Sequence, residues 1–150
     1  MPSAARLKAG PVAIVECVES IPCDPCTHAC PRQAITITGG LSNPPRIDFN
    51  KCTGCGLCIA RCPGLAIFVV NLNHSEEEAS VALPYEMLPL PRVGQRVTAL
   101  DRAGKPLCSA RVIRVLDSPK LDHCAVITIA LPKKLWNRAR GFKMPGSIRQ

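Results

Sequence analysis

Four cysteines within a twelve-residue segment have the types and spacing of iron–sulfur cluster ligands. In CTGCGLCIARCP (52–63) they follow C-x2-C-x2-C-x3-C and precede a proline; they are Cys52, Cys55, Cys58 and Cys62. In this bacterial pattern three closely spaced thiolates hold one cluster and the fourth reaches a second cluster. Gly54 and Gly56 give the loop the conformational freedom that wrapping around a compact cluster requires.

Two other uses of these cysteines fit the spacing less well. Zinc sites of this kind take two thiolate pairs separated by a longer stretch of chain. A cysteine at every third position does not easily reach disulfide geometry within one loop. The segment therefore predicts an iron–sulfur site.

A second cysteine run lies upstream and is less regular. Its members are Cys17, Cys23, Cys26 and Cys30, and Pro31 follows the last one. When the two Cys-Pro pairs are aligned, Ser20 stands where Cys52 would map. The nearest thiol to that position is Cys17, and its place in the sequence fits either a ligand or a buried strand cysteine.

The elements expected around the two runs repeat. CPRQAITI (30–37) and CPGLAIFV (62–69) both lead from Cys-Pro into an apolar strand, 32 residues apart. Short strands are also expected at 11–18 and around 45–49. The repeat predicts a pseudo-twofold βαβ–βαβ unit.

These runs resemble the bacterial ferredoxins that carry two [4Fe-4S] clusters, over about residues 11–72. In that family the last cysteine of each run crosses to the opposite cluster. The resemblance implies Cys23, Cys26 and Cys62 for cluster A, and Cys30, Cys52, Cys55 and Cys58 for cluster B. Cluster A lacks its first ligand at the usual place, and Cys17 is the candidate replacement. If Cys17 is not a ligand, cluster A would be three-iron, labile, or completed by Ser20 or water. His28 is expected on the surface, because the cysteines suffice without it.

The second half of the chain has a different pattern. RVGQRVTALDRAGKPLCSARVIRVL (92–116) alternates apolar and polar residues around a turn at 101–105, which is typical of a hairpin. Another strand is expected in 123–132, followed by a short helix or tail. The fold class is therefore α+β: a ferredoxin-like domain at 1–74, then a small antiparallel SH3-like barrel module at 75–150. Cys108 and Cys124 lie in these strands and are expected to be packing residues.

Charge also differs between the halves. Residues 1–91 have six Lys/Arg and eight Asp/Glu, a net charge of −2, whereas residues 92–150 have thirteen and three, a net charge of +10. The N-terminus has no convincing signal peptide, and no apolar run is long enough to span a membrane. Ten cysteines in such a chain suggest thiols held by metal in a reducing compartment, so we expect a cytoplasmic protein without membrane contact.

No catalytic machinery of its own is visible, because nucleotide fingerprints, phosphate loops and nucleophile elbows are absent. The pattern looks like the small ferredoxin-type subunit of multi-subunit flavin dehydrogenases that oxidise proline, hydroxyproline or opines. This resemblance implies partner subunits that carry FAD, and a second small subunit with a [2Fe-2S] cluster. The expected function is single-electron relay within an oxidoreductase complex.

Two alternatives remain open. The chain can be a free ferredoxin-type carrier that serves several oxidoreductases. The basic half can instead bind nucleic acid, although Trp136 and Phe142 are its only aromatic residues. We do not expect nucleic acid, because scattered arginines on a β module usually form a solvated face or a protein interface.

Overall fold

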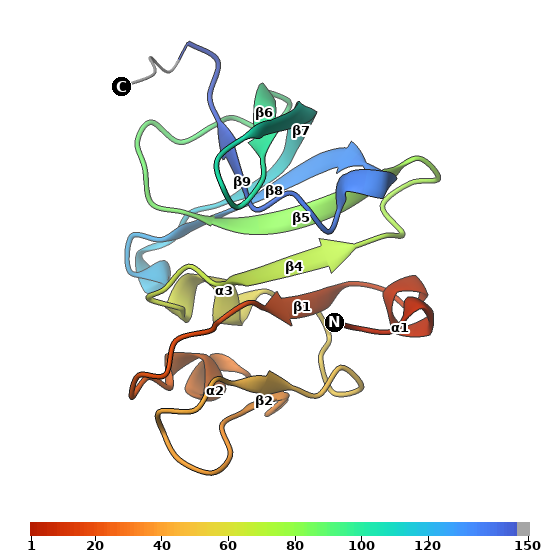
Figure 1. Cartoon of the computed structure of the whole chain (residues 1–150). Helices are drawn as coiled ribbons and strands as arrows, with labels where there is room; N and C mark the ends of the chain where they lie inside the picture. The colour runs from red at the N-terminus through yellow and green to blue at the C-terminus, as the bar shows by residue number, and fades with distance from the viewer. Residues whose placement is uncertain (147–150) are drawn as a thin grey trace.

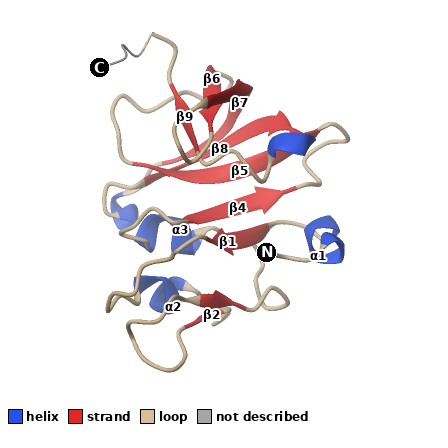
Figure 2. Ribbon diagram, viewed as in Figure 1, coloured by secondary structure: helices blue, strands red, loops and turns tan. Residues whose placement is uncertain are grey.

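The computed structural model describes residues 1–146 as a strand-rich α+β fold with short helices (Figures 1 and 2). The helices are α1 (Ala4–Lys8), α2 (Pro25–Ala29), α3 (Leu57–Arg61) and the 3-10 turns η1 (Pro119–Leu121) and η2 (Lys133–Leu135). The strands are β1 (Val12–Val15), β2 (Ile35–Thr36), β3 (Arg46–Ile47), β4 (Ile67–Asn71), β5 (Glu78–Tyr85), β6 (Arg96–Leu100), β7 (Pro106–Leu116), β8 (Ala125–Pro132) and β9 (Gly141–Lys143).

The first half has the predicted pseudo-twofold order. The chain runs β1-α2-β2 and then β3-α3-β4. β1 pairs with β4 and β2 pairs with β3, both antiparallel, so that the two repeats exchange strands. α2 and α3 lie against each other at the same end of the unit (Figure 1). The ferredoxin-like part of the predicted fold is therefore present.

One sheet continues from this unit into the second half. Its seven strands are ordered β1-β4-β5-β8-β7-β6-β9, and β4 is hydrogen-bonded to β5 through pairs such as Val69↔Ala82. An isolated β4 would leave one edge of its backbone unpaired, and β5 removes this exposed edge. The predicted SH3-like barrel is not confirmed, because its strands extend a sheet that begins at β1.

The predicted boundary at residue 74 falls in the turn between β4 and β5. The division into domains 1–74 and 75–150 therefore stays a prediction.

The hairpin predicted at 101–105 is confirmed between β6 and β7, where Asp101 Oδ1 accepts hydrogen bonds from the N–H groups of Ala103 and Lys105, each at 2.9 Å. The C-terminal tail beyond residue 146 lies outside the described residues.

Strand alternation gives the sheet two buried faces. Side chains such as Val12, Phe68 and Ile127 enter a core shared by β1 and all the strands from β4 to β9. Their neighbours, such as Ala13 and Val69, enter a second core with α3 and the cysteines on the opposite face. The cysteine-bearing helices thus pack on one face of the sheet whose other face is the core of the β-rich half.

Within residues 1–146, none of the helices combines the length and the apolar character that crossing a membrane requires.

Candidate metal centres

The four cysteines assigned to cluster B surround one cavity. Its walls include Cys30, Cys52, Cys55 and Cys58, together with apolar residues from β1, β2 and β3. Cys58 is buried on α3, Cys30 ends α2, and Cys55 is exposed in the loop before α3. The structure therefore brings together four thiols from two distant segments, as a four-thiolate cluster requires.

Backbone N–H groups point at the sulfur atoms of this set. Ala13 and Gly54 donate to Cys52 Sγ at 3.3 and 3.4 Å, and Ala34 donates to Cys30 Sγ at 3.3 Å. Such hydrogen bonds stabilise thiolates and are one means by which proteins set the reduction potential of a cluster. These sulfur atoms are therefore prepared to carry negative charge.

The four cysteines assigned to cluster A also gather. Cys17 follows β1, Cys23 precedes α2, Cys26 is buried within α2, and Cys62 ends α3. A cavity of about 180 Å³ is lined by three of them, Cys17, Cys23 and Cys62. Cys62 Sγ accepts a hydrogen bond from the Ala66 N–H at 3.4 Å. Cys17, which spacing alone left ambiguous, lies beside the other three.

The pKa values of the buried thiols show which cysteines are electrostatic neighbours. Burial raises the pKa of Cys58 to about 12, and the charges of Cys55, Cys52 and Cys30 contribute to this rise. Neighbouring thiolates disfavour one another, because like charges raise a thiol's pKa.

The thiols assigned to cluster A are also electrostatic neighbours of one another. Burial raises the pKa of Cys26 to about 11, and the charges of Cys62, Cys23 and Cys17 contribute to this rise. Burial first, and then Cys62 and Cys17, also raise the pKa of Cys23. The sets of mutual neighbours coincide with the two predicted ligand sets.

These observations fit iron–sulfur clusters in both places. Four crowded, partly buried thiols carry a full set of thiolates only when bound cations offset their repulsion, and metal ions deprotonate coordinating thiols outright. Among residues 1–146, no group of three or more His, Cys, Asp or Glu side chains is arranged around a single metal ion. A four-iron cluster distributes its thiolates over four iron atoms. Ligation by the eight individual cysteines stays a prediction.

Each helix serves both sets. α2 carries Cys26 of the cluster A set and ends at Cys30 of the cluster B set. α3 carries Cys58 of the cluster B set and ends at Cys62 of the cluster A set. The helices are in contact, and the cysteines within them are buried. Clusters bound by these two sets would therefore be held by the same pair of contacting helices.

Two supports of the Cys52 loop carry no sequence signal that we recognised. Arg6 of α1 donates to the carbonyl oxygens of Phe49 at 2.7 Å, Pro11 at 2.9 Å and Cys52 at 2.7 Å. Gly54, with φ of +68°, lies against Pro11 so closely that an added Cβ would be 2.6 Å from the Pro11 carbonyl carbon. A single arginine in a polar N-terminal segment does not by itself indicate such a role. Gly54 was predicted only to give the loop conformational freedom, and not to pack against Pro11.

The remaining candidates are not members of the two sets, although Cys124 shares the second core with Cys26 and Cys58. His28 is exposed on α2, with Nε2 3.1 Å from Asp24 Oδ2. Cys124 is buried in the second core, and Cys108 is half-buried against the first. Burial raises the pKa of both thiols. Their surroundings are those of packing residues.

Comparison with known proteins agrees with this geometry. Residues 16–66 match the family model of a 4Fe-4S dicluster domain. This segment contains both cysteine runs. No solved structure matches the chain.

Three curated relatives match part of this chain. The ferredoxin-type protein NapF of Haemophilus influenzae is 37% identical over 59 residues, which cover 37% of this chain and 33% of that protein. An uncharacterized ferredoxin of Methanocaldococcus jannaschii is 34% identical over 61 residues, 41% of this chain and 36% of that protein. A subunit of an ion-translocating oxidoreductase complex of Methanosarcina acetivorans is 46% identical over 50 residues, 33% of this chain and 18% of that protein.

The chain thus spans between 18% and 36% of the length of these relatives. The match of residues 16–66 to a 4Fe-4S dicluster domain supports two [4Fe-4S] clusters in this part of the chain. This assignment and the relatives support an iron–sulfur electron-transfer role for the protein.

Proposed function

We propose that this protein is the electron-transfer subunit of a cytoplasmic dehydrogenase complex whose other subunits carry FAD. The observation that carries the proposal is the interleaving of two thiol sets on α2 and α3 beside a large β-rich extension. One of the relatives is by name a subunit of an oxidoreductase complex, which supports a place in an assembly. The resemblance to ferredoxin-type subunits of proline, hydroxyproline or opine dehydrogenases favours a flavin partner and a companion [2Fe-2S] subunit.

We assign the ligands as two sets. Cluster A would be held by Cys17, Cys23, Cys26 and Cys62, and cluster B by Cys30, Cys52, Cys55 and Cys58. When bound, each cluster accepts and releases one electron at a time. The protein's own part is to hold the sulfur atoms, to stabilise them through backbone N–H groups, and to exclude water with buried side chains such as Ile35 and Ile59.

The side at which electrons exchange with a partner is suggested by Cys55. It is the exposed member of its set, and it borders a groove of about 370 Å³ on the face of the sheet that also carries α3. The groove is lined by apolar residues such as Val69 and Leu116, by polar residues such as Thr128, and by the basic residue Arg114. A partner seated in this groove would approach cluster B closely, as electron transfer requires.

Part of the basic charge of the second half is used internally. Arg140 and Arg102 pair with Glu16, and Arg111 pairs with Glu78 at 3.3 Å. These contacts bind the β-rich half to itself and to the cluster domain. They favour a structural use of the arginines over nucleic-acid binding, and we propose no second function.

The first test is a count of iron, acid-labile sulfide and zinc in anaerobically purified protein. Two four-iron clusters require about eight iron atoms and about eight sulfides per chain. About four of each would leave cluster B alone, and zinc without sulfide would overturn the proposal.

The partner is tested separately by tagging the chain in its native host. A flavoprotein that co-elutes in constant ratio, and that reduces the clusters when an amine or amino-acid substrate is added, is the expected result. A chain that elutes alone and reacts equally with several oxidoreductases would favour the free carrier.

A further inference from the structure

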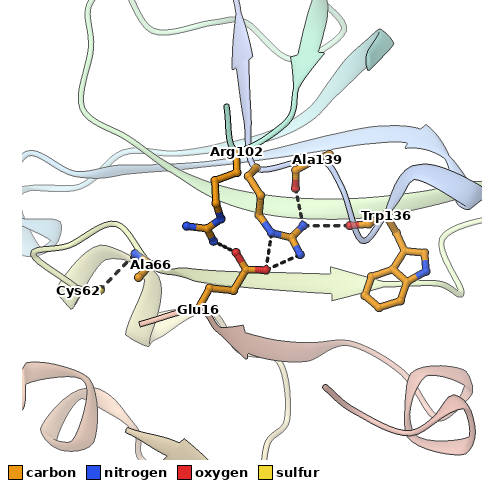
Figure 3. Close-up of polar contacts among 7 residues, drawn as sticks. Glu16, Cys62, Ala66, Arg102, Trp136 and Ala139 are labelled. Atoms are coloured by element: carbon orange, nitrogen blue, oxygen red, sulfur yellow. Dashed lines mark hydrogen bonds and ion pairs between the residues drawn. The ribbon is translucent and has the colours of Figure 1, made fainter. Parts of the chain in front are cut away.

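Three charged residues meet between the cluster domain and the β-rich half (Figure 3). Glu16 directly follows β1, Arg102 lies in the turn between β6 and β7, and Arg140 precedes β9. Arg140 donates to Glu16 Oε1 from Nε at 2.9 Å and from Nη2 at 2.7 Å. Arg102 Nη2 pairs with the other carboxylate oxygen, Oε2. One carboxylate is thus clamped by two cations from the β-rich half.

Arg140 is held rigidly. Its side chain is 5% exposed, and Nη1 donates to the carbonyl oxygens of Trp136 at 3.2 Å and Ala139 at 2.7 Å. Its guanidinium carbon lies 5.1 Å from the centre of the Phe68 ring, over β4. The planar guanidinium therefore has partners both at its edge and at its face, which is the use to which arginine is best suited.

The clamp is connected to cluster A through two short routes. Glu16 is bonded to Cys17 along the chain. The Glu16 N–H donates to the Ala66 carbonyl oxygen at 2.8 Å. The Ala66 N–H in turn donates to Cys62 Sγ at 3.4 Å (Figure 3). Glu16 and Arg102 also line the 180 Å³ cavity that Cys17 and Cys62 line.

Within the clamp two guanidinium cations face one carboxylate, so these three side chains together carry a charge of +1, and Arg140 is removed from solvent screening. The carboxylate of Glu19 lines the same cavity, so the two arginines offset the acidic side chains beside cluster A. A cluster becomes more negative when it is reduced, so a nearby positive charge stabilises the reduced form and raises the reduction potential.

We propose that Arg140 and Arg102 are positioning and charge-tuning residues for cluster A. Arg140 holds Glu16, and through it the backbone that presents Cys17, at the one ligand position where the cysteine run is irregular. The positive charges of Arg102 and Arg140 raise the reduction potential of cluster A above the value that it would have without them. The β-rich half thereby acts on a cluster to which it contributes no ligand, and this inference rests on the cluster A ligand set assigned above.

The test is a redox titration of the full chain, followed by electron paramagnetic resonance, in which the two clusters serve as internal references. Arg102→Gln removes one exposed charge and should lower the potential of cluster A, while the iron content and the potential of cluster B stay unchanged. Arg102→Lys, which keeps the charge, should restore the potential. Arg96→Gln on β6 changes the net charge equally away from the clamp and should shift neither cluster.

Arg140→Gln probes the positioning role. It removes the buried partner of Glu16 and should lower the potential of cluster A further, with a broadened signal from cluster A or a loss of its iron. Arg140→Lys should recover the potential only in part, because an ammonium group does not reproduce the guanidinium contacts.

Two results would overturn the inference: a cluster A potential that is unchanged in both Arg102→Gln and Arg140→Gln, or an equal shift of both clusters in either variant. Failure of the underlying assignment has another signature. A wild-type chain with fewer than two four-iron clusters, or a Cys17→Ala variant that keeps cluster A intact, would remove the ligand set itself, whatever the arginine variants do.

Discussion

Alanine substitutions at Gly54 and Gly56 separate two effects of replacing a glycine: backbone strain and the steric clash of the added Cβ. Gly54 and Gly56 both have left-handed backbone, with φ of +68° and +81°. Alanine in that conformation costs roughly 1–2 kcal/mol at either site. The two positions differ in the room for a Cβ. At Gly56 the nearest atom would be Ile59 Cδ1 at 3.6 Å, an ordinary contact, whereas at Gly54 it would be the Pro11 carbonyl carbon at 2.6 Å.

The clash at Gly54 cannot be relieved by a small movement of Pro11. Pro11 precedes β1, its carbonyl oxygen accepts a hydrogen bond from Arg6 at 2.9 Å, and Val12 is paired with Val70. Movement of Pro11 would strain β1, from which the Ala13 N–H reaches Cys52 Sγ. Overpacking of this kind costs about 1–3 kcal/mol beyond the backbone term, so we expect Gly54→Ala to cost roughly 2–5 kcal/mol in total and Gly56→Ala roughly 1–2 kcal/mol.

The assay is chemical denaturation of both variants, together with iron counts after anaerobic purification. Gly54→Ala should lose cluster B, about four iron atoms per chain, while Gly56→Ala keeps both clusters. If Gly54→Ala is as stable as Gly56→Ala and retains all of its iron, the close packing of the loop on Pro11 does not support the cluster.

Three further predictions follow from the same geometry. Cys17→Ala should lose cluster A, about four iron atoms per chain, whereas Cys108→Ala should lose none; equal iron in the two variants would exclude Cys17 as a ligand. Arg6→Gln should lower the free energy of unfolding by about 2–3 kcal/mol through loss of charged hydrogen bonds to the Cys52 loop, measured against the exposed control Lys8→Gln, and equal stability of the two would contradict a role for Arg6. Ile127→Ala, at a fully buried position of β8, should lower the free energy of unfolding by about 2–5 kcal/mol. Because the sheet is continuous, far-ultraviolet dichroism and cluster absorbance of this variant should report one shared unfolding transition. Two separate transitions would instead support independent domains at 1–74 and 75–150.

Much of the site's chemistry was readable from the sequence, because cluster ligands are specified by local spacing. C-x2-C-x2-C-x3-C with a following proline needs one loop and one short helix, and the repeat of Cys-Pro before an apolar strand predicts the pseudo-twofold unit around it. The hairpin at 101–105 was equally local, since Asp101 forms the turn with residues close in sequence. The spacing could not decide the role of Cys17, because a five-residue separation from Cys23 is compatible with either a ligand or a packing residue.

Only the tertiary structure decided how the two halves are joined. Alternation of apolar and polar residues identifies β4 and β5 as strands, but it does not say which strand lies beside which, so one continuous sheet through both halves cannot be predicted from it. The Glu16–Arg140 pair joins residues 124 positions apart, and Arg6 reaches Cys52 across 46 positions. Such contacts leave no local pattern in a single sequence. The Glu16–Arg140 contact arises because the shared sheet brings the end of β1 and the start of β9 to the same place, where the Arg140 side chain is buried and would be costly to leave without a partner.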